Sequence, residues 1–178
     1  MFKTVLLITC FTVLIISLLS STNNFLDIKS IITDHFNIIK NNWIQAAIIY
    51  LIPIAIAIII SKKKLIDTNT LDNLNLVLSI LISMFFSVLS ILCSINSQNR
   101  NYKYQLLLKE TSTSTIFEIT ICLLLLFISF SLIFIGIKTI NNNTIKQIAS
   151  IIVYYLTMIA ILNIFMILKR IKSIFDNK

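Results

Sequence analysis

Five apolar runs, each about as long as a membrane-crossing helix, divide this chain of 178 residues. They cover residues 4–20, 43–60, 74–95, 116–137 and 148–168, and short clusters of polar and charged residues separate them. About 20 apolar residues, rising 1.5 Å each, cross the hydrocarbon core of a bilayer as one helix. The sequence therefore predicts an all-α, polytopic integral membrane protein, with one membrane domain over residues 1–178, about five spans and short loops.

The charge balance fits the same class of protein. Hydrophobic residues make up 57 % of the chain and charged residues only 12 %, which is too few charges to cover a soluble core. The net charge of +8 comes largely from lysines beside the apolar runs, where they favour anionic lipid headgroups. No basic stripe with interleaved aromatic residues is present, so we expect the bilayer as partner and no direct contact with nucleic acid.

The first two segments allow different interpretations. Residues 4–20 are either a retained first span, which we favour, or the core of a secretory signal cut after Thr22. Residues 25–40 repeat apolar side chains at helical spacing and predict an amphipathic helix lying at the membrane interface. His35 lies in this segment beside Asp34, a pair that could sense pH or bind a metal. We expect instead a solvated loop histidine that contacts the membrane or a partner.

The third run carries its polar residues on one side. On a helix of 3.6 residues per turn, they fall within an arc of roughly 120°. This serine stripe predicts a helix interface or a pore face, and the other side, which includes Leu78, Phe85 and Leu92, is expected to face lipid. The stripe residues that we single out are Asn75, Ser79, Ser83, Ser87, Ser90 and Ser94.

Two further polar residues are predicted inside the membrane. Glu118 falls in the first turn of the run 116–137, where it is either a functional intramembrane carboxyl or a water-reaching charge near a helix N-terminus. We favour the second interpretation. Asn163 lies deep in the last run and is expected to form a hydrogen bond to another helix, which contributes about 0.5–2 kcal/mol.

Basic residues in the connections set the expected orientation. Lys62, Lys63 and Lys64 follow the second run, and Lys103 lies in a predicted loop over residues 96–115; we expect these lysines to contact lipid headgroups or a partner. With five spans, the side of the longer loops and C-terminal tail holds nine Lys and Arg residues against six. The positive-inside rule then places the tail in the cytoplasm. The bias toward Ile and Asn is typical of AT-rich coding, which is common in horizontally acquired bacterial genes and also occurs in organelles and AT-rich eukaryotes. We favour a bacterial source, and hence the bacterial inner membrane.

The sequence lacks the signatures of common catalytic and cofactor sites. There is no GxGxxG, Walker loop, HExxH or GxSxG motif, no pair of intramembrane carboxylates, and no cysteine spacing for a metal. We therefore expect no enzymatic activity, no cofactor and no metal.

In size and span number, the chain resembles two loose groups of small bacterial membrane proteins. These are the immunity proteins against pore-forming bacteriocins and the membrane subunits of phage-defence systems such as the Rex and Kiwa types. The resemblance covers architecture only and implies a multi-pass membrane protein in immunity or antiviral defence. We expect a non-enzymatic subunit that acts by helix–helix contact, as a homo-oligomer or with a toxin or cytosolic effector. The alternative is an oligomeric ion channel or pore lined by the serine stripe.

Overall fold

The structure, a computed structural model, describes residues 28–40, 43–95, 101–136 and 143–176. The predicted all-α, multi-pass membrane architecture is confirmed, because four of the helices are long and apolar enough to cross a membrane: α3, α4, α5 and α6. The predicted first span, 4–20, lies outside the described residues. The helices in the described part of the chain are α2 (Ile28–Ile39), α3 (Trp43–Lys63), α4 (Thr68–Ser94), α5 (Tyr102–Ile135) and α6 (Asn143–Asp176).

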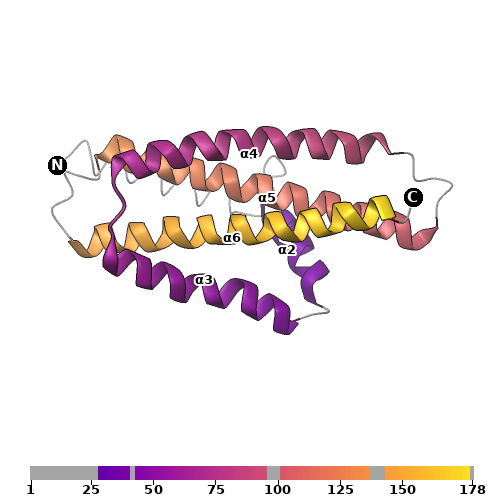
Figure 1. Cartoon of the computed structure of the whole chain (residues 1–178), viewed down its shortest axis with the longest axis horizontal. Coiled ribbons are helices and arrows are strands. Elements are labelled where there is room, and N and C mark those ends of the chain that lie inside the picture. Colours follow the sequence, from indigo (N-terminus) through magenta and orange to yellow (C-terminus); the bar gives the residue numbers. More distant parts are fainter. Residues whose placement is uncertain (1–27, 41–42, 96–100, 137–142, 177–178) are drawn as a thin grey trace.

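The four long helices lie side by side in the order α4, α5, α6, α3 (Figure 1). The short helix α2 packs against α5. Successive long helices run in opposite directions, so that α3 ends and α4 begins at the same end of the bundle at which α6 begins. At the opposite end, α4 ends, α5 begins and α6 ends.

The predicted loop over residues 96–115 is wrong for most of its length, because α5 already begins at Tyr102. The run 116–137 is therefore only the apolar part of a longer helix. At 34 residues each, α5 and α6 are about 51 Å long at 1.5 Å per residue. Since the hydrocarbon core is about 30 Å thick, the polar ends of both helices extend beyond it.

Two local signals fix helix ends. The Asp67 side chain caps α4 by accepting a hydrogen bond of 3.0 Å from the Thr70 N–H. The bonds from the Thr70 hydroxyl and N–H hold the pKa of Asp67 below its usual range. The single glycine of the chain, Gly136, ends α5 with φ at 73°, a left-handed conformation that glycine adopts without steric cost.

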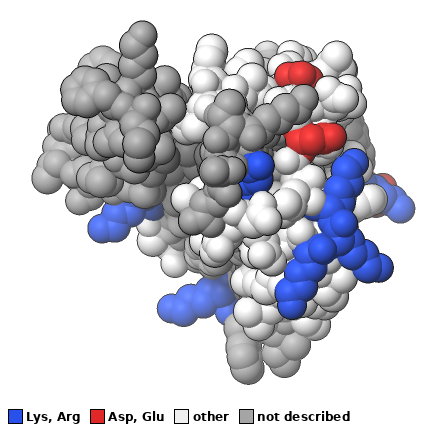
Figure 2. Space-filling model, turned by 90° about the vertical axis from the view of Figure 1, so that its left-hand side faces the viewer, with Lys and Arg blue, Asp and Glu red and all other residues white. Residues whose placement is uncertain are grey.

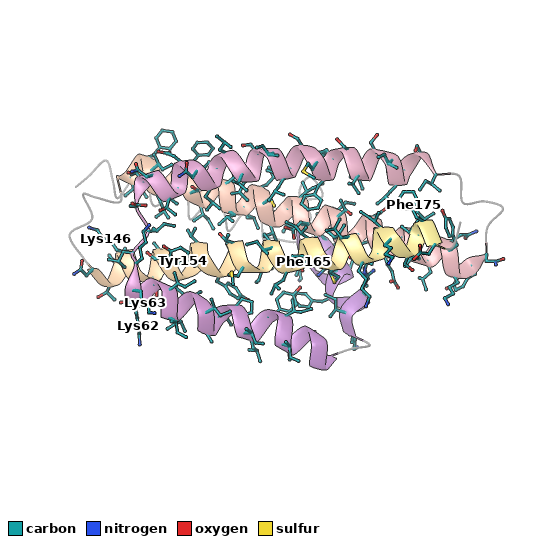
Figure 3. All side chains as sticks on the ribbon, viewed as in Figure 1. Lys62, Lys63, Lys146, Tyr154, Phe165 and Phe175 are labelled. Carbon is teal, nitrogen blue, oxygen red and sulfur yellow. The ribbon has the colours of Figure 1, made fainter. Side chains whose placement is uncertain are left out.

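The core lies where α4, α5 and α6 meet. Its fully buried members include Leu71 and Leu78 of α4, Leu125 of α5 and Val153 of α6. The α3–α4 connection is fastened to α6 because the N–H of Ile66 donates to Ser150 Oγ at 3.0 Å and Tyr154 Oη donates to the carbonyl of Lys64 at 3.3 Å. Figure 3 shows Tyr154 on α6 near this connection.

Candidate functional site

The serines of the stripe face away from the rest of the chain. Ser79, Ser83, Ser87, Ser90 and Ser94 are all exposed, and we call this surface the serine face. The buried side of α4 is Leu71, Asn75, Leu78, Phe85 and Leu92, about 140° around the helix from the serines. The prediction that Leu78, Phe85 and Leu92 face lipid is therefore wrong: they pack inside the bundle, and the serines are outside.

Four of the five hydroxyls of the serine face bond to their own helix. Ser79 Oγ donates to the carbonyl of Asn75 at 2.8 Å, and Ser83 and Ser87 each donate at 3.0 Å to the carbonyl four residues earlier. Ser94 donates to the carbonyl of Ile91 at 2.8 Å. Because these four donors are already satisfied, they can meet lipid or another helix without being left unpaired.

Asn75 departs from the other members of the stripe. Its side chain is buried, and its Oδ1 accepts no hydrogen bond. The stripe therefore comprises one inward amide and an outward serine face. Its predicted role as an interface or pore face stays a prediction.

Glu118 is the centre of a polar cluster inside the bundle. It lies near the middle of α5 and is fully buried, so the expectation of a water-reaching residue in the first turn of a helix is wrong. Cys122 Sγ, one turn later, donates to Glu118 Oε1 at 3.6 Å, whereas Glu118 Oε2 has no hydrogen-bond partner. An ionisable residue at such a place is costly and marks a functional candidate.

Asn163 brings α6 to the same cluster. Its side chain is buried and lies against the Glu118 carboxyl, but Asn163 Nδ2 does not reach hydrogen-bond geometry with any acceptor. The predicted neighbour on another helix is therefore present, while the predicted bond is not made. An unpaired donor of α6 and an unpaired acceptor of α5 face each other, so a small side-chain movement would join them.

His35 of α2 is buried against Phe117, the residue that precedes Glu118. Its ring stacks on Phe117 with centroids 3.7 Å apart and an angle of 7° between the planes, and His35 Nε2 lies 3.1 Å from Tyr50 Oη of α3. The predicted solvated loop histidine is therefore wrong: His35 is the centre of the buried face of α2. Burial, helped by the positive charge of Arg170, lowers the pKa of His35 to about 4.

The sequence interpretation missed the buried hydroxyls that continue the cluster along α5. Thr111, Ser114 and Thr115 are buried, and the two threonine hydroxyls donate to the carbonyls four residues earlier, at 2.7 and 2.9 Å. With Glu118 and Cys122, they recur at spacings of three, four and seven, which is one face of a helix. That periodicity was the signal for a helix in a stretch that its polar composition marked as a loop.

The predicted lysines lie at the two ends of the bundle. Lys62 and Lys63 end α3, Lys64 follows, and all three are exposed. Figure 3 shows Lys62 and Lys63 at the same end of the bundle as Lys146 of α6, and Figure 2 shows several Lys and Arg side chains on the surface at this end. Lys103 is exposed in the first turn of α5, not in a loop. Two turns further along α5, Glu110 Oε2 forms an ion pair of 3.0 Å with Arg170 Nη1 of α6.

Comparisons with known proteins assign this arrangement to no family. No family model, curated protein or solved structure matches the chain. Within the described ranges, no group of three or more His, Cys, Asp or Glu residues is arranged to hold a metal ion. The features that carry the functional argument are therefore the outward serine face of α4 and the inner cluster around Glu118.

Proposed function

We propose that this protein is a non-enzymatic membrane subunit that works by binding another membrane helix through the serine face of α4. The observation that carries the proposal is that the small residues of α4 point outward, while the apolar side packs on α5. Helices in lipid gain no hydrophobic energy by associating, and small side chains let their backbones approach closely. The first partner that we propose is a second copy of the chain.

Large side chains border the serine face on the exposed surface of α4. Ile80 and Phe86, which lie at the two edges of the serine face around the helix, are at least half exposed, with exposed fractions of 54 and 53 %. A partner helix seated on the serines would contact such side chains along its edges. Dispersion contacts of this kind, together with backbone proximity, supply the association energy.

The biological setting that we propose is bacterial defence, either bacteriocin immunity or a phage-defence membrane component. It rests on the size and span number of the chain. In this setting, the protein lies in the inner membrane with a cytoplasmic tail, and a toxin or cytosolic effector is the alternative partner for the serine face. The second candidate function is an oligomeric channel, in which several copies turn the exposed serines toward a shared axis.

The test is a bulky substitution on the serine face. The double variant Ser83→Leu and Ser87→Leu fills the face and should abolish energy transfer between differently labelled copies in vesicles. Ser131→Leu is the matched control, because Ser131 is a partly exposed serine of α5 that also bonds its own helix, to the carbonyl of Phe127 at 2.7 Å. Unchanged association of the double variant, or equal loss with Ser131→Leu, would refute the proposal.

A further inference from the structure

A groove opens beside α6 near the end of its apolar run. Its volume is about 590 Å³, and α2, α3 and α5 contribute the other walls through Ile39, Ile49 and Glu110. It is open to the surroundings of the bundle, because Phe165 on its wall is 65 % exposed and Lys169 is exposed. We call it the α6 groove, and Figure 3 marks Phe165 on the helix that forms it.

The wall that α6 contributes changes from apolar to basic along the helix. Leu162, Phe165 and Met166 come first, followed one turn later by Lys169 and Arg170. These positions recur at spacings of three and four and so share one face of the helix. The apolar run of α6 ends at Leu168, and basic residues at the end of a span lie at headgroup level. The groove therefore crosses from the depth of acyl chains to the depth of headgroups.

At the basic end of the groove, Arg170 has N–H donors that its ion pair with Glu110 does not use. Arg170 uses Nη1 for Glu110, and a guanidinium has five N–H donors in all. A second hollow of about 330 Å³ shares Glu110 and Leu107 with the groove and adds the exposed Lys103. The two hollows together are thus lined by three basic side chains, Lys103, Lys169 and Arg170, and by one carboxylate, Glu110, which leaves positive charge for an anionic ligand.

We propose that the α6 groove binds an anionic glycerophospholipid. Its phosphodiester lies against Lys169 and Arg170, and the upper part of an acyl chain lies against Leu162, Phe165 and Ile49. The charge and the order of the walls match this amphiphile, and basic pockets between membrane helices are known headgroup sites. The site is separate from the serine face, which is on α4, so the two proposals fail independently.

Lipid retention tests the site. The protein is reconstituted in vesicles of equal parts phosphatidylglycerol and phosphatidylcholine with the same acyl chains, extracted in mild detergent, and its bound lipid is counted by native mass spectrometry. The unchanged protein should retain phosphatidylglycerol in preference. Lys169→Gln should lower this retention by about fivefold, the typical contribution of one basic residue near the headgroups. Lys146→Gln, at the other end of the same helix, should leave it unchanged.

A bulky residue tests the acyl part of the groove. Leu162→Trp should expel the lipid, whereas Ile161→Trp, on the neighbouring exposed position of α6, should not. Circular dichroism and gel filtration establish that both variants fold. Equal retention of the two lipids by the unchanged protein would overturn the proposal. Equal losses with Lys169→Gln and Lys146→Gln would also overturn it, because they would show only attraction to basic bundle ends.

Discussion

Removal of the His35 ring should release α2 from the bundle. His35→Ala deletes the stack on Phe117, which contributes about 1 kcal/mol, and the hydrogen bond to Tyr50, which contributes about 1 kcal/mol. It also leaves a cavity where a fully buried ring was, at a cost of about 3 kcal/mol. Removal of the buried His35 Nδ1, which has no hydrogen-bond partner, offsets about 1–3 kcal/mol of these losses. We therefore expect the docking free energy of α2 to fall by about 2–4 kcal/mol.

His35→Phe separates the stack from the hydrogen bond. Phenylalanine keeps a ring on Phe117 and loses the bond to Tyr50, a cost of about 1 kcal/mol. It also removes the buried His35 Nδ1, which has no hydrogen-bond partner and whose desolvation costs about 1–3 kcal/mol. The gain equals or exceeds the loss, so the phenylalanine variant should dock α2 as well as the original or up to about 2 kcal/mol more tightly.

Amide hydrogen exchange of α2, measured by mass spectrometry in lipid nanodiscs, reports this docking. A loss of about 2–4 kcal/mol corresponds to exchange that is roughly 30- to 1,000-fold faster, at 1.4 kcal/mol per tenfold. The exchange of α4, which carries no His35 contact, is the internal control. Unchanged exchange of α2 in His35→Ala, or equal acceleration in His35→Phe, would refute this explanation of the His35 site.

Three further predictions follow from the same structure. Acid should loosen α2: burial lowers the pKa of His35 to about 4, so the stabilisation is complete above the ordinary value of 6.5 and is lost as the pH falls toward 4. Tyr50 contacts this ring, Arg170 helps to lower its pKa and Glu118 acts on Tyr50, and His35→Phe changes none of the three. This variant should therefore show no faster exchange of α2 in acid, once the measured rates are corrected for the pH dependence of intrinsic amide exchange. Single cysteines at 99 and at 177 should be labelled from one face of the membrane, and a cysteine at Lys64 from the other face, because α4 and α6 end at one end of the bundle and α3 ends at the other. Labelling of 99 and 177 from opposite faces would contradict this arrangement of the helices. Alanine at Ser79, Ser83, Ser87 and Ser90 together should preserve assembly, since packing needs small volume and the lost bonds are within α4; loss of ion flux in vesicles with assembly intact would favour the channel instead.

The spans were predictable because hydrophobic length is a strong signal in a membrane protein. The faces of the spans were not. In lipid, an apolar side chain is equally suited to a neighbouring helix and to an acyl chain, so the pattern of α4 did not show that Phe85 packs inward while Met84 points outward. The contact with α5 determines which apolar residues of α4 are buried, and the hydropathy of α4 alone does not predict that contact.

For the inner cluster around Glu118, the sequence identified two of the residues but not the contact between them. Glu118 and Asn163 stand out in apolar surroundings, and both were named from the sequence. The sequence did not show that these two residues lie against each other. A helix that begins at 116 places Glu118 at the edge of the membrane, whereas α5 begins at Tyr102 and so places Glu118 near its middle. His35 was misjudged because a polar residue in an amphipathic segment was assigned to the polar side, whereas a ring stack and the Tyr50 hydroxyl hold it on the buried side.

The most direct test of the serine face is site-specific cross-linking in membranes. Single cysteines are placed at Ser83 or Ser87, in a protein whose own three cysteines are replaced by alanine, and disulfide formation between copies is induced with an oxidant. Cysteines at Val77 and Met84 are the controls, because these residues are also exposed on α4 but lie about 100° or more from the centre of the serine face. We predict a cross-linked dimer from positions 83 and 87 and little from positions 77 and 84. Equal cross-linking at all four positions, or cross-linking at 77 and 84 alone, would contradict association through the serine face.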